Sequence, residues 1–266
     1  ALPKLAWLAL AGNPLNAAQE AAALQQIDTI AYDSLVVGEQ LGEGASGTIY
    51  RAQRAGQAVA LKLFKGEMTS DGLPLSEMAA SAAAGQHPHL IGVYGVLQGN
   101  SQQGHRQQGL VLPLMSPHLT TLAHPPSLTT CTRDVYASGL SLPLVNVIAM
   151  AKGIALAASH LHTKGMIHGD LYAHNILYDA TGLAILGDFG AASFLPQDEA
   201  QARALQRIEV RAMGLLLAEL IAHSSERLAE LDRLQAACLS ETRPTMFAVA
   251  NELQRISCCD MASAIE

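Results

Sequence analysis

The sequence contains few aromatic and few charged residues. Of its 266 residues, 4% are aromatic and 15% are charged, whereas 50% are hydrophobic, and these are mostly Ala and Leu. A chain of this length can form one large domain or two small ones with a substantial core. The net charge is −7 and no run of five basic residues occurs, so the composition argues against nucleic acid or an anionic membrane as a partner.

Metal-binding and disulfide patterns are also missing. The ten histidines include the close pairs His87/His89 and His160/His162, but no nearby group of cysteines or acids completes a metal site. No C-x-x-C pair or zinc spacing occurs among the four cysteines, which are Cys131, Cys238, Cys258 and Cys259. We interpret them as free thiols in a reducing compartment, and we expect a cytoplasmic location.

A membrane-spanning segment is not predicted. The longest apolar stretch, from about Leu144 to Ser159, is interrupted by Asn146 and Lys152. A spanning helix needs about 20 predominantly apolar residues. The N-terminal residues ALPKLAWLALAG have the composition of a secretion signal, but a different pattern accounts better for their leucines.

The N-terminal residues resemble one leucine-rich repeat. The spacing L-x-x-L-x-L-x-x-N-x-L is matched by Asn13 together with Leu2, Leu5, Leu8, Leu10 and Leu15. A single repeat cannot bury its own apolar face, so either the chain is part of a longer protein or the repeat is a terminal cap. Chance spacing is the alternative. We predict a repeat remnant over 1–16 and a helical linker over 17–33, where NAAQEAAALQQID favours helix.

The stretch LGEGASGTIYRA contains Gly42, Gly44 and Gly47 in the spacing G-x-G-x-x-G. This spacing alone fits either a dinucleotide-binding turn, which leads into a helix, or a phosphate-binding hairpin between two strands. The residues TIYRAQ that follow favour a strand, RAGQ favours a turn, and AVALKLF predicts a second strand. The glycines are therefore expected between two strands, where backbone N–H groups can approach phosphates.

From this point the chain resembles a protein kinase, with the signature motifs in order from about Leu35 to Ile256. AVALK resembles the lysine strand and LSEMAASAAAG the helix that carries its glutamate partner. MIHGDLYAHNILYD resembles the catalytic loop, and LAILGDFGAAS carries the D-F-G triplet. The resemblance implies that Asp170 is the catalytic base, assisted by Lys62 and Glu77, and that Asn175 and Asp188 bind Mg²⁺.

The resemblance also implies where ATP binds. Pro113 would offer its carbonyl group and Met115 its N–H group to the adenine edge, behind Leu112 as gatekeeper. Ile49, Ala60 and Leu177 would enclose the base. The complete expected nucleotide site comprises Leu41, Gly42, Glu43, Gly44, Ala45, Ser46, Gly47, Ile49, Ala60, Lys62, Pro113, Met115 and Leu177.

Three departures from the kinase pattern are visible. Gly169 replaces the arginine that precedes the catalytic aspartate. Tyr172 stands where serine/threonine kinases usually carry Lys, and His174 stands where tyrosine kinases often carry Arg. Neither residue therefore indicates which type of hydroxyl is phosphorylated. The A-P-E motif is missing. The resemblance places Glu209 where the family's central helix carries an aspartate, and Glu209 follows Asp188 by only 21 positions, which predicts a short activation segment.

The sequence therefore predicts an α+β, two-lobed protein kinase-like fold over 34–258, preceded by the repeat remnant. We expect an N-lobe over 34–113 and a C-lobe over 116–258. The predicted function is phosphoryl transfer from ATP to a protein hydroxyl, serine or threonine more readily than tyrosine. Two alternatives stay open: a pseudokinase or scaffold that binds protein partners through leucine-rich repeats, and a small-molecule kinase, because HGDLYAHNIL is also similar to loops of aminoglycoside and choline kinases.

Overall fold

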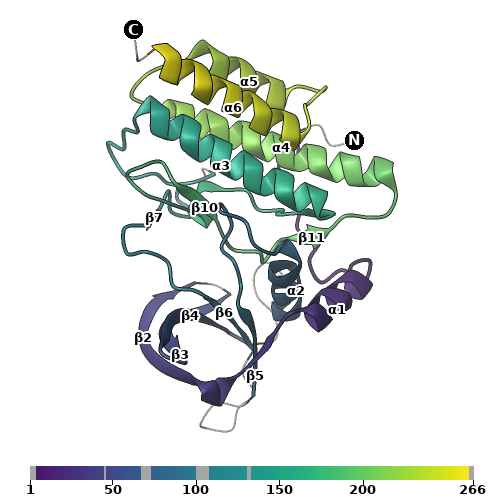
Figure 1. The fold of residues 1–266 in the computed structure, drawn as a ribbon. Coiled ribbons are helices and arrows are strands. Elements are labelled where there is room, and N and C mark those ends of the chain that lie inside the picture. The colour runs from purple at the N-terminus through teal and green to yellow at the C-terminus, as the bar shows by residue number, and fades with distance from the viewer. Residues whose placement is uncertain (1–3, 45, 67–72, 100–107, 131–132, 264–266) are drawn as a thin grey trace.

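The computed structural model describes residues 4–263 except 45, 67–72, 100–107 and 131–132. These residues form two lobes, one built on a β-sheet and one built mainly of helices (Figure 1). The predicted α+β, two-lobed fold is therefore confirmed. The site described below lies where the two lobes meet.

The N-lobe contains a six-stranded sheet with the strand order β1-β5-β6-β4-β3-β2. Its strands are β1 (Thr29–Ala31), β2 (Leu35–Glu43), β3 (Gly47–Arg54), β4 (Gln57–Phe64), β5 (Gly95–Gln98) and β6 (Gly109–Pro113). The predicted turn between β3 and β4 is formed by Ala55 and Gly56, both with positive φ. This conformation matches the twist of a two-residue hairpin.

Two helices pack against one another beside this sheet. They are α1 (Ala17–Gln26) and α2 (Pro74–Ala84). Proline at the start of α2 fits the first helical turn, where its missing N–H group is not needed. Alanine and serine fill most of the buried face of α2, which allows close packing against its neighbours.

The C-lobe is built on α3 (Leu144–Thr163), α4 (Glu199–Ala222), α5 (Ala229–Leu239) and α6 (Met246–Ser263), which lie together in Figure 1. It also contains β7 (Thr120–Thr121), β8 (Met166–Ile167), β9 (Ile176–Tyr178), β10 (Ala184–Leu186) and β11 (Ser193–Phe194). Two 3₁₀ turns complete the described elements, η1 (Tyr32–Ser34) and η2 (Ala173–Asn175). β7, β9 and β10 form a small sheet, and β8 pairs with β11.

The core of the C-lobe forms around α3. Ile148, Ile154 and Leu161 along this helix are almost completely buried. By length and composition, α3 also qualifies as a membrane span, but 61% of its most apolar window is buried inside the protein. A core helix of a soluble protein has the same properties, so the finding does not establish a membrane span.

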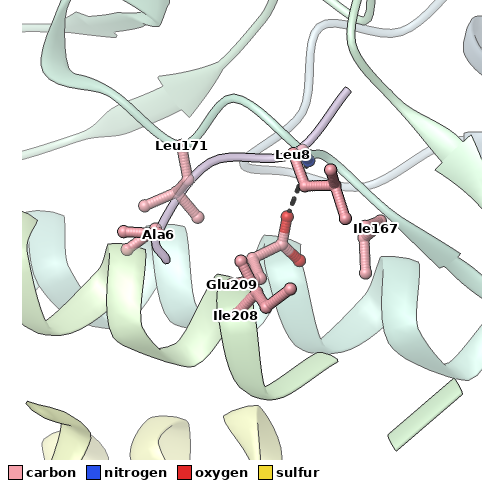
Figure 2. A pocket seen from close by; sticks show the side chains of 8 residues that line it. Ala6, Leu8, Ile167, Leu171, Ile208 and Glu209 are labelled. Carbon is pink, nitrogen blue, oxygen red and sulfur yellow. Dashed lines mark hydrogen bonds between the residues drawn. The ribbon is translucent and has the colours of Figure 1, made fainter. Parts of the chain in front are cut away.

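Residues 4–16 contain no helix or strand and lie against the C-lobe. Arg211 on α4 donates to the Lys4 carbonyl oxygen, and Ala6 and Leu8 pack over the helix (Figure 2). The Asn13 side chain accepts from the Leu15 N–H group over 3.1 Å. Leu15 itself is 83% exposed, so it does not fill a core.

The predicted linker over 17–33 is helical only as far as Gln26. Its second half forms β1, which pairs in parallel with β5 and places Thr29 opposite Val96. This segment therefore belongs to the N-lobe sheet and is more than a linker between residues 1–16 and the kinase-like domain. Ile30 is 1% exposed, which explains why the segment joins the core.

Candidate active site

The glycine-rich stretch forms a hairpin between β2 and β3, as predicted. Gly44 donates its N–H group to the Gly47 carbonyl oxygen over 2.9 Å. A Cβ atom on Gly47 would lie 2.4 Å from the Leu63 carbonyl oxygen, whereas Cβ atoms on Gly42 and Gly44 would meet nothing within 4 Å. Gly47 is thus required for strand packing, and Gly42 and Gly44 leave open backbone that a phosphate can approach.

The side chains of Glu43 and Lys65 contact one another beside the turn of this hairpin. They form an exposed ion pair, and Lys65 also donates to the Gly44 carbonyl oxygen over 3.2 Å. Hydrogen bonding to Lys65 lowers the pKa of Glu43. Ala45 lies outside the described residues, and Ser46 is buried at the hairpin tip.

Lys62 on β4 joins the two lobes. Its Nζ atom lies 2.5 Å from Glu77 Oε1 on α2 and 3.9 Å from Asp188 Oδ1 in the C-lobe. Both Lys62 and Glu77 are less than 10% exposed, so each charge has its opposite close by in a poorly solvated position. The lysine is therefore held with its ammonium group directed toward Asp188.

Ile49 and Ala60 share a face of the sheet with Lys62. Ile49 lies opposite Lys62 in the β3–β4 register, and Ala60 precedes Lys62 by two positions on the same strand. Leu177 lies on β9 in the other lobe. Pro113 ends β6, and Met115 follows it in the connection between the lobes. The residues predicted to surround the adenine therefore come from β3, β4, β6, β9 and the connection between the lobes.

The catalytic-loop motif brings Asp170 and Asn175 together. Asn175 Nδ2 donates to Asp170 Oδ2 over 2.8 Å and to the Asp170 carbonyl oxygen over 3.0 Å. The amide thus fixes both the backbone and the carboxylate of Asp170. Its own carbonyl oxygen remains as a hard ligand of the kind that Mg²⁺ prefers.

The D-F-G triplet places a strained residue beside the lysine. Asp188 has a φ of 55°, a left-handed conformation that is uncommon for residues with a side chain and that clusters at functional sites. Its Oδ1 atom accepts from the Gly190 N–H group over 3.2 Å. Phe189 is buried with its ring centroid 5.3 Å from that of His168, which joins the triplet to the catalytic loop.

Glu209 on α4 anchors the start of the catalytic loop, in the place expected for the central helix's acid. One carboxylate oxygen accepts from the N–H groups of His168 and Gly169 over 2.7 and 3.0 Å, and the other contacts His162 Nε2 over 2.7 Å. Figure 2 shows Glu209 beside Leu8 and Ile167. Burial opposes ionisation, but the bonds with His162 and the Gly169 backbone outweigh it and lower the pKa of Glu209.

The residues present fit ATP and Mg²⁺. The hairpin offers open backbone, Lys62 offers a fixed positive charge, and Asp188 with Asn175 offers oxygen ligands. Among the described residues no group of three or more His, Cys, Asp or Glu side chains forms a metal site, and the histidine pairs have structural contacts instead. Mg²⁺ needs few protein ligands when phosphates supply the others.

Gly169 is explained by backbone crowding. It has a φ of +81°, and a Cβ atom there would lie 2.5 Å from the Ala191 carbonyl oxygen. An arginine at this position would therefore be strained. The activation segment is short, as predicted, because α4 begins at Glu199 with Asp198 as its N-cap. Arg243 donates to the Arg207 carbonyl oxygen over 3.2 Å.

Two residues of the site were not identified from the sequence. Arg133 donates to the Leu171 carbonyl oxygen over 3.2 Å, and the buried Asp134 accepts from the Ala173 N–H group over 2.9 Å. Arg133 also pairs with Glu219 and lies 3.9 Å from the Tyr172 ring centroid. The sequence does mark them in one way, because Arg133 and Asp134 are the only Asp, Glu, Lys or Arg residues between 107 and 151.

Asp134 also binds His174. Its Oδ1 atom lies 2.5 Å from His174 Nδ1, and His174 Nε2 lies 3.9 Å from Asp170 Oδ2. Burial by itself lowers the pKa of His174, but the hydrogen bond and charge of Asp134 outweigh it, so the pKa is raised above its ordinary value. His174 is therefore held beside Asp170, with its side chain partly buried.

Comparison with known proteins identifies the family. Residues 35–225 match the family described as protein tyrosine and serine/threonine kinase. The chain belongs to this kinase family. The matched range covers the hairpin, Lys62, the catalytic loop and the D-F-G triplet, so the family relationship rests on the same residues that meet at the site.

Several curated kinases are similar to the chain. Cell division control protein 2 homolog D of Antirrhinum majus is 28% identical over 61% of this chain and 51% of its own length. Cyclin-dependent kinase B2-1 of Oryza sativa is 26% identical over 82% of this chain and 66% of its own length. Fibroblast growth factor receptor 1 of Pleurodeles waltl is 25% identical over 60% of this chain and 21% of its own length. The chain spans about half the length of the Antirrhinum protein and of cyclin-dependent kinase B2-1 of Arabidopsis thaliana.

Proposed function

We propose that this chain is an ATP-dependent protein kinase that phosphorylates serine or threonine more readily than tyrosine. The contact of Lys62 with both Glu77 and Asp188 carries the proposal, because it joins the phosphate-binding lysine to the metal-binding aspartate across the two lobes. Similarity to cyclin-dependent kinases over most of the chain supports the choice of serine or threonine.

The residues divide the work of phosphoryl transfer. Lys62 holds the nucleotide phosphates, and Glu77 keeps the ammonium group in place. Asp188 and Asn175 would hold Mg²⁺, which neutralises phosphate charge when it is bound. Asp170 orients the acceptor hydroxyl and takes its proton, while the Asn175 amide fixes the carboxylate. Positioning and charge neutralisation supply most of the catalysis in this type of reaction.

The first experiment tests nucleotide binding. The melting temperature of the chain should rise with ATP, and the rise should increase when Mg²⁺ is added, because a ligand that binds only the folded state stabilises it. Asp188→Ala should remove the effect of Mg²⁺. If ATP raises the melting temperature equally with and without Mg²⁺, and equally in Asp188→Ala, a scaffold without phosphoryl transfer would be favoured.

The second experiment tests transfer itself. Labelled ATP is supplied with casein as a generic protein acceptor, and in parallel with choline and an aminoglycoside. We expect label in casein and none after Lys62→Met, whereas Lys164→Met, a change at an exposed lysine on the C-lobe, should leave transfer unchanged. Label in the small alcohols alone would identify a small-molecule kinase.

We also propose that residues 1–16 are a leucine-rich-repeat remnant through which a protein partner binds, and that the chain acts in the cytoplasm. The Asn13 turn and the leucine spacing support the first proposal. The buried Cys238 and exposed Cys258, both free thiols, support a reducing compartment.

A further inference from the structure

The N-terminal segment of the chain lies against the catalytic loop. Ala6 and Leu8 line a small pocket together with Gly169 and Leu171, the residues on either side of Asp170 (Figure 2). The approach at Gly169 is close, because a Cβ atom there would lie 3.3 Å from the Leu8 carbonyl oxygen. This segment therefore covers the backbone that carries the catalytic aspartate.

The same segment reaches α2 through the carboxylate of Glu20 on α1. Glu20 Oε1 accepts from the Gly12 N–H group over 3.2 Å, and Glu20 Oε2 accepts from the Ser76 hydroxyl group over 3.0 Å. Ser76 is 1% exposed, in the first turn of α2. Asn16 holds the stretch between, since its buried amide donates to the Leu10 carbonyl oxygen over 3.0 Å. One side chain thus joins the N-terminal segment, α1 and α2.

Two apolar contacts strengthen this connection. Gly12 has a φ of +70°, and a Cβ atom there would lie 3.3 Å from the Leu73 side chain, so the segment approaches the start of α2 closely. Leu24, near the other end of α1, packs against a buried cluster that includes Met78 of α2. Figure 1 shows the two helices beside one another. Among the described residues no side chain caps the start of α2, so α1 supplies the polar contact there.

Ser76 directly precedes Glu77, the partner of Lys62. Successive residues of an α-helix are about 100° apart around its axis, so their side chains leave the helix toward different neighbours. Glu77 extends toward Lys62 on the sheet, and Ser76 extends toward Glu20 on α1. The first turn of α2 is therefore held from two sides. A rotation or shift of this turn would break both contacts together.

We propose that residues 4–26 couple the catalytic loop to Glu77, and that Glu20 is the positioning residue in this connection. The inference rests on the proposed function. The family match does not assign this role, because the match begins only at residue 35. Gly12 and Glu20 therefore lie outside the part of the chain that the kinase motifs cover.

The bond between Glu20 and Ser76 acts by selecting one position of α2. In that position the Glu77 carboxylate holds the Lys62 ammonium group near Asp188. A charge that is already in place stabilises a transition state better than one that must be reoriented during the reaction. Without the bond, a fraction of the molecules has Glu77 displaced, and kcat falls by that fraction. Glu20 itself takes no part in the transfer.

Two substitutions of Glu20 test whether its hydrogen bonds carry the effect. Glu20→Ala removes both bonds, whereas Glu20→Gln keeps an oxygen for Gly12 and offers an amide that can donate to the Ser76 hydroxyl oxygen. We expect Glu20→Ala to lower kcat for casein about 3-fold to 10-fold, the factor that the free energy of one hydrogen bond corresponds to. The Kd for MgATP should stay within about twofold of wild type. Glu20→Gln should recover most of the loss in kcat.

Ser76→Ala and Gln25→Ala are the matched variants. Ser76→Ala breaks the same bond from the α2 side with the loss of one oxygen atom, so it should lower kcat as Glu20→Ala does. It also tests the bond if Glu20→Ala does not fold. Gln25→Ala changes an exposed side chain on the same helix as Glu20 and should leave kcat unchanged. Melting temperatures show which variants are folded at the assay temperature.

A second background separates positioning from general stabilisation. Glu77→Gln removes the charge that α2 places beside Lys62, so in this background Glu20→Ala should change the residual kcat by less than about twofold. A merely structural role of Glu20 would lower kcat by the same factor in both backgrounds. Single-turnover transfer with excess enzyme measures the residual rate.

The outcomes distinguish this inference from the proposed function. If the wild type phosphorylates casein but folded Glu20→Ala or Ser76→Ala has wild-type kcat, the connection does not position Glu77. An equal loss of kcat with Glu77 and with Glu77→Gln would also overturn the inference. A wild-type chain that neither binds MgATP nor transfers phosphate would overturn both proposals.

Discussion

The catalytic loop and the glycine hairpin face the same candidate nucleotide site but are held in opposite ways. In the loop, Glu209, Asp134 and Asn175 bind backbone and side chains from three directions. In the hairpin, the described contacts near the turn include an exposed ion pair, a hydrogen bond from Lys65 to the Gly44 carbonyl oxygen and a backbone hydrogen bond from Gly44 to Gly47. Glu209 and Asp134 bind loop groups that are 39 to 41 positions away in the sequence, whereas Glu43 and Lys65 at the hairpin are 22 positions apart.

The difference reflects what each part does. The loop must hold Asp170 within hydrogen-bond distance of a reacting oxygen, and small displacements there are costly. The hairpin must let phosphates approach its backbone, so its open positions need space more than support. Variants in the two regions should therefore fail in different ways, in catalysis for the loop and in nucleotide affinity for the hairpin.

The largest effect is expected at the centre of the loop. Asp170→Asn keeps the shape of the side chain but cannot accept the hydroxyl proton. We predict a loss of kcat on the order of 10²-fold or more with an unchanged Kd for MgATP. Steady-state transfer to casein and ATP titration measure the two quantities. A parallel loss of nucleotide affinity would show that Asp170 has a structural role.

The next largest effect is expected at the anchor of the loop. Glu209→Ala leaves the buried His168 N–H group and the partly buried Gly169 N–H group without this acceptor, so the free energy of unfolding should fall by about 3 kcal/mol. Glu209→Gln keeps one acceptor oxygen and should cost about half as much. The lowered pKa of Glu209 means that the ionised group stabilises the fold above pH 4.5 and that this contribution is lost as pH falls through the lowered value.

Urea unfolding at several pH values tests this anchor. The difference in the free energy of unfolding between wild type and Glu209→Gln should be constant from pH 8 to about pH 5. It should shrink below the ordinary glutamate pKa of 4.5. A difference that grows toward acid pH would contradict the assignment of an ionised Glu209.

Two glycines of the hairpin offer a matched pair. Gly47→Ala forces a Cβ atom against the Leu63 carbonyl oxygen and should destabilise the chain by about 1 to 3 kcal/mol. Gly44→Ala meets no protein atom, so it should leave the melting temperature unchanged and instead weaken MgATP binding. Equal effects of the two substitutions on stability would show that the hairpin is packed along its whole length.

The order of the motifs made the two lobes predictable from the sequence. Lys62, Glu77, Asp170, Asn175 and Asp188 each lie in a recognisable local pattern, and their joint spacing implied the fold. Glu209 was identified because it takes the place of the central helix's aspartate, although its three hydrogen bonds were not predicted. The lobe that carries the loop could therefore be predicted, together with most of the residues at its centre.

The supports of the loop were not predictable in the same way. Asp134 lies in a long connection without helical or strand periodicity, and its partner His174 is 40 positions away. Residues 4–16 lie across the C-lobe, and Thr29–Ala31 add a strand to the N-lobe sheet, through packing that leaves no local pattern. Such contacts depend on the three-dimensional arrangement, which the sequence of one chain does not reveal.

The smallest effect is expected in the activation segment, where we predict that phosphorylation is not needed for activity. In kinases that need it, the phosphate pairs with the arginine beside the catalytic aspartate through charge-assisted hydrogen bonds. Here that position is Gly169, where a Cβ atom would crowd the Ala191 carbonyl oxygen. Ser193 is the only hydroxyl residue between Phe189 and Glu209, and it is 1% exposed in β11, paired with Ile167. A kinase acting in trans could reach this side chain only after β11 separated from β8, and the short segment costs little entropy to order by itself. Phosphatase-treated chain and Ser193→Ala should therefore phosphorylate casein within about twofold of the untreated chain, a change near the ±0.5 kcal/mol typical of neutral substitutions. A silent dephosphorylated chain that recovers when Ser193 is phosphorylated would show that β11 opens and that phosphorylation orders the activation segment.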